Sequence, residues 1–313
     1  MTNLFMPPRA LGDTILVTGI IDLYKTEHSA IVASACVAPL FEDFPNLERL
    51  TVVDKEPWKK HWLKSWRVTR GVVWDLLISA RGTLLSRLLR ARKKQIWPRT
   101  QSPIHKVDQI SAWFGYQKPI WPTIWVSQER HERMRPSRPT LAVAPIAGWI
   151  GKQWPLENFI TLLQMFCETY PEAQVAIFAA LHERDRILPL LDALPQDQCV
   201  DTIGQHLLDT AALIKWSQVF IGNDSGLMHM SLAVKTPTIA LFGPSDERIF
   251  GPWSDQVPSP HRVVRGAPFT GHVPQNPLDT KCYMNAIIVP LVWETLQERW
   301  ENVGDPQQRV ACK

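Results

Sequence analysis

Two short apolar segments, each followed by a polar turn that contains glycine, constrain the fold of this chain most strongly. Residues 219–222 precede the turn 223–226, and residues 238–242 precede the turn 243–246. Both segments are too apolar to face water, so we expect two parallel strands at the centre of a covered sheet, joined by a helix over 227–233. Such turns can present backbone N–H groups to a phosphate at a helix N-terminus. The sequence therefore predicts an α/β protein that handles a nucleotide-linked ligand.

The same alternation of strands and helices extends through the whole chain. Further strands are expected near 4–6, 30–33, 50–53, 76–78, 141–144, 174–178 and 200–203. Further helices are expected near 14–26, 58–70, 84–92, 156–169, 183–193 and 208–216. Alternation of this kind is typical of parallel sheets with right-handed crossovers. We therefore predict the α/β class, with two Rossmann-like parallel-sheet domains that face a central ligand-binding cleft.

The basic, proline-containing segment 127–139 is the expected linker between domains at 1–134 and 139–288. No apolar run approaches the roughly 20 residues of a membrane span, and the short stretch 15–21, closed by Asp22, does not have the form of a signal peptide. The five cysteines are scattered without CxxC spacing. They indicate a reducing cytoplasm and argue against structural zinc.

Charge is distributed unevenly along the chain. Residues 1–138 carry 22 Lys and Arg against 12 Asp and Glu, whereas the remainder carries 12 against 18. The first half is therefore expected to meet an anion. Part of its basic charge interleaves with tryptophans spaced by four residues: Lys55, Lys59, Lys60, Lys64, Arg67 and Arg70 with Trp58, Trp62 and Trp66. A membrane surface or anionic glycolipid and simple core packing of the indoles both remain open, whereas nucleic acid is disfavoured because no recognition motif accompanies the charge.

Polar loops follow the first strand of each half and are expected to face the cleft. One loop carries Asp13 and the other carries Lys152. In the turn after the strand at 219–222, Asp224 or Ser225 is either a ligand contact or an ordinary helix N-cap, and His229 is either a ligand contact or a core histidine. No carboxylate pair or histidine cluster has metal-ligand spacing, so neither a metal nor a cofactor is expected. The absence of GxGxxG after either first strand disfavours a nicotinamide-dependent dehydrogenase.

Several short motifs occur in a specific order along the chain. They are Arg9-x-x-Gly12-Asp13, Trp74-Asp75-Leu76-Leu77-Ile78 with Arg81-Gly82, Lys152-x-Trp154-Pro155 with Phe159, His182-Glu183, Asn223-Asp224-Ser225-Gly226-Leu227-Met228-His229, Phe242-Gly243-Pro244-Ser245-Asp246, and Cys282-Tyr283-Met284-Asn285. In this order the chain resembles the heptosyltransferases of bacterial lipopolysaccharide core synthesis, family nine of the glycosyltransferases. The resemblance implies the GT-B architecture and a C-terminal helix, 289–303, that crosses back to the first domain.

The resemblance also implies a reaction. It is the inverting, metal-independent transfer of a heptose or related sugar from a nucleotide diphosphate, with ADP-heptose as the expected donor, to an anionic lipopolysaccharide core acceptor. Asp13 matches the base that deprotonates the acceptor hydroxyl, and Lys152 matches the lysine that binds the leaving diphosphate. Donor contacts are implied for Gly148, Glu183, Asp224, Ser225, Gly226 and His229, and acceptor contacts are expected from Arg9, Gly12, Lys59, Lys60, Lys64 and Arg81.

Structural alternatives exist for the main roles: a helix N-cap for Asp13, a solvated surface lysine for Lys152, and a first-turn helix carboxylate for Glu183. The chain also departs from the family, which often carries hydroxyl residues a few positions before the lysine, where Ala147, Gly148 and Trp149 stand here. Backbone N–H groups at Gly148 could replace those hydroxyls, whereas bulky Trp149 could alter the donor pocket.

These departures leave other functions open. A transferase could use a different nucleotide sugar for another surface glycan. A GT-B sugar-nucleotide 2-epimerase and a non-catalytic sugar-nucleotide-binding relative are the remaining alternatives. We expect a cytoplasmic location, with peripheral contact at the cytoplasmic face of the inner membrane as an option, and no nucleic-acid partner.

Overall fold

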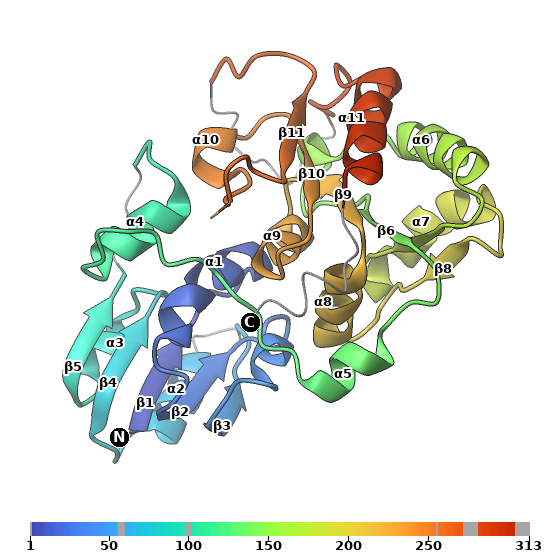
Figure 1. Ribbon diagram of the computed structural model, residues 1–313. Coiled ribbons are helices and arrows are strands. Elements are labelled where there is room, and N and C mark those ends of the chain that lie inside the picture. The colour runs from blue at the N-terminus through green and yellow to red at the C-terminus, as the bar shows by residue number, and fades with distance from the viewer. Residues whose placement is uncertain (1, 56–59, 98–101, 255, 272–280, 304–313) are drawn as a thin grey trace. The chain divides into compact units, whose positions relative to one another are not determined.

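The computed structural model describes residues 2–55, 60–97, 102–254, 256–271 and 281–303, without the side chains of 60–62 (Figure 1). The chain divides into two compact units, Met1–Ser127 and Gln128–Lys313. Each unit is built around its own parallel sheet. The predicted α/β class with two parallel-sheet domains is therefore confirmed.

The first unit contains a five-stranded sheet in the order β3-β2-β1-β4-β5. Its strands are β1 (Thr2–Met6), β2 (His28–Ala33), β3 (Leu47–Val52), β4 (Trp74–Ser79) and β5 (Ala91–Ile96), and its helices are α1 (Leu11–Asp22), η1 (Ala38–Phe41), α2 (Lys60–Thr69), α3 (Leu84–Leu88) and α4 (Lys106–Trp113). The apolar side chains of the central strands are buried, including Leu4, Met6 and Leu77. The sheet thus has the covered centre that its near-continuous apolar strands predict.

The region after β4 differs from the expected single helix over 84–92. Helix α3 ends at Leu88, and Ala91 begins the edge strand β5, which pairs with β4. The strand reads Ala-Arg-Lys-Lys-Gln-Ile and is largely exposed. Because it pairs on one side only, cations are tolerated there, and the sequence lacks the apolar run that would indicate a strand.

The second unit contains a six-stranded sheet in the order β11-β10-β9-β6-β7-β8. Its strands are β6 (Thr140–Ala144), β7 (Gln174–Ile177), β8 (Cys199–Asp201), β9 (Val219–Asn223), β10 (Thr238–Phe242) and β11 (Arg262–Arg265). Its helices are α5 (Gln128–Arg133), η3 (Ile150–Lys152), α6 (Leu156–Thr169), η4 (Leu181–Glu183), α7 (Arg184–Asp192), α8 (Leu207–Trp216), α9 (Gly226–Ala233), α10 (Glu247–Phe250) and α11 (Val289–Glu301). Every residue of β6, β9 and β10 is buried, as expected for central parallel strands.

The segment predicted as a linker contains helix α5, which packs against α8 of the second unit. Arg130 and Arg133 both donate to Asp209 Oδ1, at 2.8 and 2.7 Å. His131 stacks on Trp216 with ring centroids 4.4 Å apart, and the Trp216 indole donates to the His131 carbonyl. These contacts explain how a strongly basic segment becomes an ordered helix.

Helix α11 packs against α6 and β11 of the second unit. Val292 and Leu296 are buried in the core, and Trp300 meets Phe166 edge-on at 4.8 Å. The predicted return of this helix to the first domain stays a prediction.

The strand order defines the position of a ligand site in the second unit. From β6 the chain proceeds outward through β7 and β8, and it then returns to the other side of β6 through β9, β10 and β11. The order therefore reverses between β6 and β9. In open α/β sheets, ligands bind outside the carboxyl ends of the strands at such a switch point.

Candidate nucleotide-sugar site

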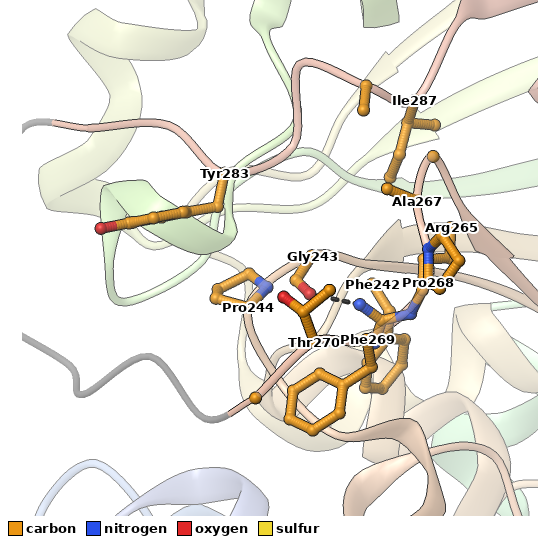
Figure 2. A pocket seen from close by; sticks show the side chains of 13 residues that line it. Phe242, Gly243, Pro244, Arg265, Ala267, Pro268, Phe269, Thr270, Tyr283 and Ile287 are labelled. Carbon is orange, nitrogen blue, oxygen red and sulfur yellow. Dashed lines mark hydrogen bonds between the residues drawn. The ribbon is translucent and has the colours of Figure 1, made fainter.

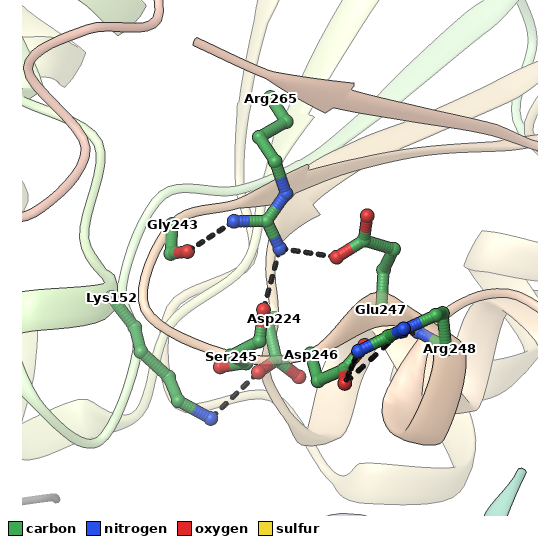
Figure 3. A network of polar contacts seen from close by, with 8 residues as sticks. All are labelled: Lys152, Asp224, Gly243, Ser245, Asp246, Glu247, Arg248 and Arg265. Carbon is green, nitrogen blue, oxygen red and sulfur yellow. Dashed lines mark hydrogen bonds and ion pairs between the residues drawn. The ribbon is translucent and has the colours of Figure 1, made fainter. Parts of the chain in front are cut away.

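The loops that follow β6 and β9 bring Lys152 and Asp224 together at the switch point (Figure 3). Lys152 Nζ lies 2.6 Å from Asp224 Oδ2, with the lysine side chain 28% exposed and the aspartate side chain 6% exposed. The structure therefore brings together Lys152, predicted to bind the leaving diphosphate, and Asp224, predicted to contact the donor. If a ligand separated the two groups, the buried carboxylate and the partly exposed ammonium group would each need another polar partner.

Asn223 fixes the geometry of this pair. Its side chain is fully buried; Nδ2 donates to the carbonyl of Pro145 at 2.7 Å, and Oδ1 accepts from the backbone N–H of Trp154 at 3.0 Å. The amide thus binds both ends of the loop that carries Lys152. Asn223 belongs to one of the motifs named above, but the sequence predicts no role for it. The available signal was a polar amide directly after a buried strand.

Gln153 provides a second brace, which the sequence does not predict. Its Nε2 donates to the carbonyl of Ala147, and its Oε1 accepts from Arg186 of α7 at 2.6 Å. The side chain is buried. Because Gln153 directly follows Lys152, these bonds restrict the position of the lysine backbone.

The N-terminus of α9 lies beside the ion pair, directly after Asp224. Ser225 has the N-cap position with an extended backbone, φ −149° and ψ 176°, but its side chain makes no capping hydrogen bond. Ser225 Oγ is buried and has no hydrogen-bond partner within the described part of the chain. The first turn, which starts at Gly226, therefore keeps N–H groups and the positive end of the helix dipole for a ligand.

His229 lies one turn into α9 and is 5% exposed. Its ring stacks on Trp253, with centroids 5.5 Å apart and planes 9° apart. This packing accords with the core-histidine alternative, and a ligand contact by His229 stays a prediction.

Glu183 lies at the end of η4, after β7. Its carboxylate accepts from the backbone N–H of Ala180 at 2.9 Å. The first-turn alternative is therefore present in the structure. A donor contact by Glu183 stays a prediction.

Trp149 and Gly148 occupy two of the three positions, 147–149, where the sequence departs from the family pattern. The Trp149 ring is 4% exposed, lies 5.7 Å from the Tyr283 ring and covers Gly151, where a Cβ atom would lie 2.5 Å from the indole. Its buried Nε1 has no hydrogen-bond partner among the described residues. Gly148 is exposed, and a Cβ there would meet nothing within 4 Å. The indole thus packs against the loop that carries Lys152.

In the first unit, Asp13 is exposed in the first turn of α1. The N-cap position belongs to Ala10, so the suggested N-cap role of Asp13 is wrong. Burial lowers the pKa of Lys106, and the charge of nearby Asp13 acts in the opposite direction. The lysine side chain also lies over the ring of Trp97 at 5.6 Å.

Arg81 braces the loop that precedes α1. It is 9% exposed; Nε donates to the carbonyl of Pro7 at 2.7 Å, and Nη2 donates to the carbonyl of Val32 at 3.0 Å. Burial, with a smaller effect of nearby Arg9, lowers the pKa of Arg81 to about 10. Its observed contacts are thus internal, and an acceptor contact stays a prediction.

The other predicted acceptor residues are distributed over the first unit. Arg9 is half-buried and Gly12 lies within α1. Lys64 is exposed on α2. The backbone of Lys60 belongs to α2, but its side chain lies outside the described residues, as does the whole of Lys59. Acceptor binding by these five residues stays a prediction.

Within the described residues, no cluster of three or more His, Cys, Asp and Glu side chains could hold a metal ion. None of the helices that these residues form combines the length and the apolar character needed to cross a membrane.

Comparison with solved structures defines the class of protein. E. coli ADP-heptose lps heptosyltransferase II has a TM-score of 0.75 at 20% identity, covering 96% of this chain and 99% of that one. E. coli heptosyltransferase WaaC with ADP has a TM-score of 0.72 at 17% identity, covering 96% and 100%. The fold is therefore the GT-B fold of glycosyltransferases.

The sequence defines the family. The model for glycosyltransferase family 9 (heptosyltransferase) matches residues 69–260, and the chain belongs to this family. Lipopolysaccharide heptosyltransferase 2 of Escherichia coli K12 is 30% identical over 158 residues, covering 47% of this chain. That match spans 43% of the length of the relative.

Proposed function

We propose that the protein is an inverting, metal-independent glycosyltransferase that moves a heptose or related sugar from a nucleotide diphosphate to an anionic lipopolysaccharide core acceptor. ADP-heptose is the proposed donor. The observation that carries the proposal is the Lys152–Asp224 ion pair at the switch point, beside the start of α9. The names of the relatives and the presence of ADP in the WaaC structure support this choice of substrates.

Lys152 and α9 provide the charge stabilisation that the reaction needs. As the glycosidic bond breaks, negative charge develops on the leaving diphosphate. An ammonium group and backbone N–H donors at that position stabilise the transition state more than the ground state. In this proposal the diphosphate binds the Lys152 ammonium group and the backbone N–H groups near Ser225 and Gly226. Asp224 then accepts hydrogen bonds from hydroxyls of the sugar.

Asp13 is the proposed base. Inverting transfer requires a base that removes the proton of the acceptor hydroxyl as that oxygen attacks the anomeric carbon. Asp13 is exposed in the first turn of α1 and is not used as a cap, so its carboxylate is accessible. The exposed cations of the first unit would receive the acidic groups of the acceptor.

The surface of α2 supports a peripheral contact with the cytoplasmic face of the inner membrane. Leu63 and Trp66 are 62% and 36% exposed, and Lys64 and Arg67 are exposed beside them. Exposed apolar and cationic side chains on one helix favour the headgroup region of an anionic membrane.

A different nucleotide sugar is the second candidate for the donor, because Ala147, Gly148 and the buried Trp149 stand where the family often carries hydroxyl residues. Calorimetric titration with ADP-heptose, ADP, ADP-glucose, UDP-glucose and UDP-N-acetylglucosamine separates the candidates. The proposal expects selective binding of ADP-heptose. A preference for a UDP-sugar would retain the fold and move the function to another glycan.

A further inference from the structure

A pocket of about 160 Å³ opens at the carboxyl ends of β10 and β11, within the second unit (Figure 2). Pro244 and Arg265 contribute to its wall, together with Phe269, Thr270 and Tyr283. None of these five residues is among those predicted to bind donor or acceptor. The pocket therefore requires an explanation of its own.

Arg265 holds one wall of the pocket in place (Figure 3). Its guanidinium donates to the carbonyls of Gly243 and Ser245 and to the carboxylate of Glu247, and the side chain is 12% exposed. It also lies over the ring of Phe269 at 5.5 Å. A single side chain thus fixes the turn after β10 and supports an aromatic ring that lines the pocket. This preorganisation reduces the entropy cost of binding a ligand.

The charge of the lining residues themselves is balanced, and Lys281 lies outside the lining, over the ring of Tyr283 at 5.0 Å. Among the described lining residues, Arg265 carries the permanent charge, and the ion pair with Glu247 at 2.5 Å neutralises it. A phosphate would have to compete with Glu247, so the arrangement disfavours an anion. It favours an uncharged ligand.

The lining also favours a ring with apolar faces and polar edges. Phe269, Tyr283 and Pro244 offer apolar surfaces, and Thr270 offers a hydroxyl. Arg265 Nε is buried and has no hydrogen-bond partner in the described part of the chain. A cavity of roughly 150 Å³ accommodates one six-membered ring. A pyranose has this size, with C–H groups on its faces and hydroxyls at its edge.

The pocket adjoins the ion pair through the backbone of β10. Asp224 N–H donates to the carbonyl of Leu241 at 3.2 Å, and the pocket begins one residue further on, at Phe242. The ion pair and the pocket thus lie at the ends of neighbouring strands of one sheet.

We infer that the pocket is a subsite for a neutral pyranose ring. The ring belongs either to the transferred sugar of the donor or to an uncharged sugar of the acceptor glycan. The inference rests on the proposed function, because it assumes a ligand that carries sugars.

The test fills the pocket or removes one of its walls. Ala286→Trp places an indole at an exposed lining position, and Phe269→Ala removes an aromatic wall. Glu168→Trp, at an exposed position on α6, is the matched control for added bulk. Calorimetry measures the Kd of ADP-heptose and of ADP for each variant. Transfer assays with a purified lipopolysaccharide core acceptor measure KM and kcat.

A donor-sugar subsite predicts that both pocket variants bind ADP-heptose about tenfold more weakly or worse, with unchanged ADP binding. An acceptor subsite predicts unchanged binding of both nucleotides and a comparable rise in the acceptor KM. Either result supports the inference. Wild-type affinities and KM values in both variants would overturn it and leave the proposed function intact. A wild-type protein that neither binds nor transfers any of the sugars would overturn both.

Discussion

Lys152 Nζ lies 2.6 Å from Asp224 Oδ2, and this ion pair joins the loops that follow β6 and β9. In the same place, Ser225 leaves the first turn of α9 without a side-chain cap in the described structure. An anion bound at that turn would attract the Lys152 ammonium. The proposed mechanism therefore couples donor binding to an exchange of partners at Lys152.

Replacing Lys152 with Met should reduce kcat about 10²–10³-fold, because the leaving diphosphate loses its cation. It also leaves Asp224 buried without its partner, which should lower the free energy of unfolding by about 1–3 kcal/mol. Transfer assays and urea unfolding measure the two effects. The double variant Lys152→Met, Asp224→Asn should recover stability without recovering activity, and wild-type turnover in Lys152→Met would contradict the role of this lysine.

Asn223→Ala should detach the loop that carries Lys152 from the end of β9. It removes hydrogen bonds to Pro145 and Trp154 from a fully buried site, so we expect a loss of about 1–3 kcal/mol in stability and weaker nucleotide binding. Thermal unfolding and calorimetry provide the readouts. Asn302→Ala, which removes an exposed bond to Glu298, is the control and should change neither.

Asp13→Asn should abolish transfer and leave donor affinity nearly unchanged, because the amide cannot accept the acceptor proton. The side chain is exposed and is not an N-cap, so stability should change little. Kinetics and calorimetry on the same preparation separate catalysis from binding. Retention of full turnover would remove Asp13 from the mechanism.

Gly151→Ala should displace the Trp149 ring, since the new Cβ would lie 2.5 Å from it. We expect destabilisation of about 1–3 kcal/mol and impaired donor binding, because Lys152 is the next residue. In the double variant Gly151→Ala, Trp149→Ser the clash is absent, so its loss of stability should be smaller than the sum of the losses in the two single variants. A fully additive double-mutant cycle would show that the two residues do not interact.

The buried ring of His131 predicts lower stability in acid. Burial lowers its pKa from 6.5 to about 4, with nearby Lys215 acting in the same direction and Glu132 against it. The unfolded chain therefore binds the proton more readily. Stability should be complete above about pH 6.5 and fall towards pH 4, by about 3 kcal/mol at most.

Urea unfolding at about pH 7 and about pH 5 tests this dependence. His131→Phe keeps an aromatic ring on Trp216 and should flatten the pH dependence. His182→Gln, at an exposed position, should leave it unchanged. If the free energy of unfolding of His131→Phe depends on pH as steeply as that of the wild type, groups other than His131 cause the acid sensitivity.

Much of the fold was predictable because the central strands are buried on both sides. Such strands read as continuous apolar runs, and β6, β9 and β10 lie close to their predicted positions. Edge strands β5 and β11 escaped prediction, since pairing on one side allows Arg and Lys within them. The strand order in the six-stranded sheet of the second unit then defines the position of the switch point.

The residues of the candidate site were predictable where a motif directly follows a strand. They were less predictable where contacts between distant segments determine the position of a side chain. Lys152 and Asp224 were expected in one site, and the structure pairs them. The brace at Asn223 depends on loops far apart in the sequence, and so does the packing of Trp149 on Tyr283. Local patterns carry no signal for such contacts.

The most direct test of the central claim is the release of ADP from ADP-heptose, measured with and without a lipopolysaccharide core acceptor that lacks the transferred heptose. We predict ADP release that requires the acceptor and produces stoichiometric glycosylated acceptor. Donor turnover without the acceptor, or binding without any turnover when both substrates are present, would contradict it.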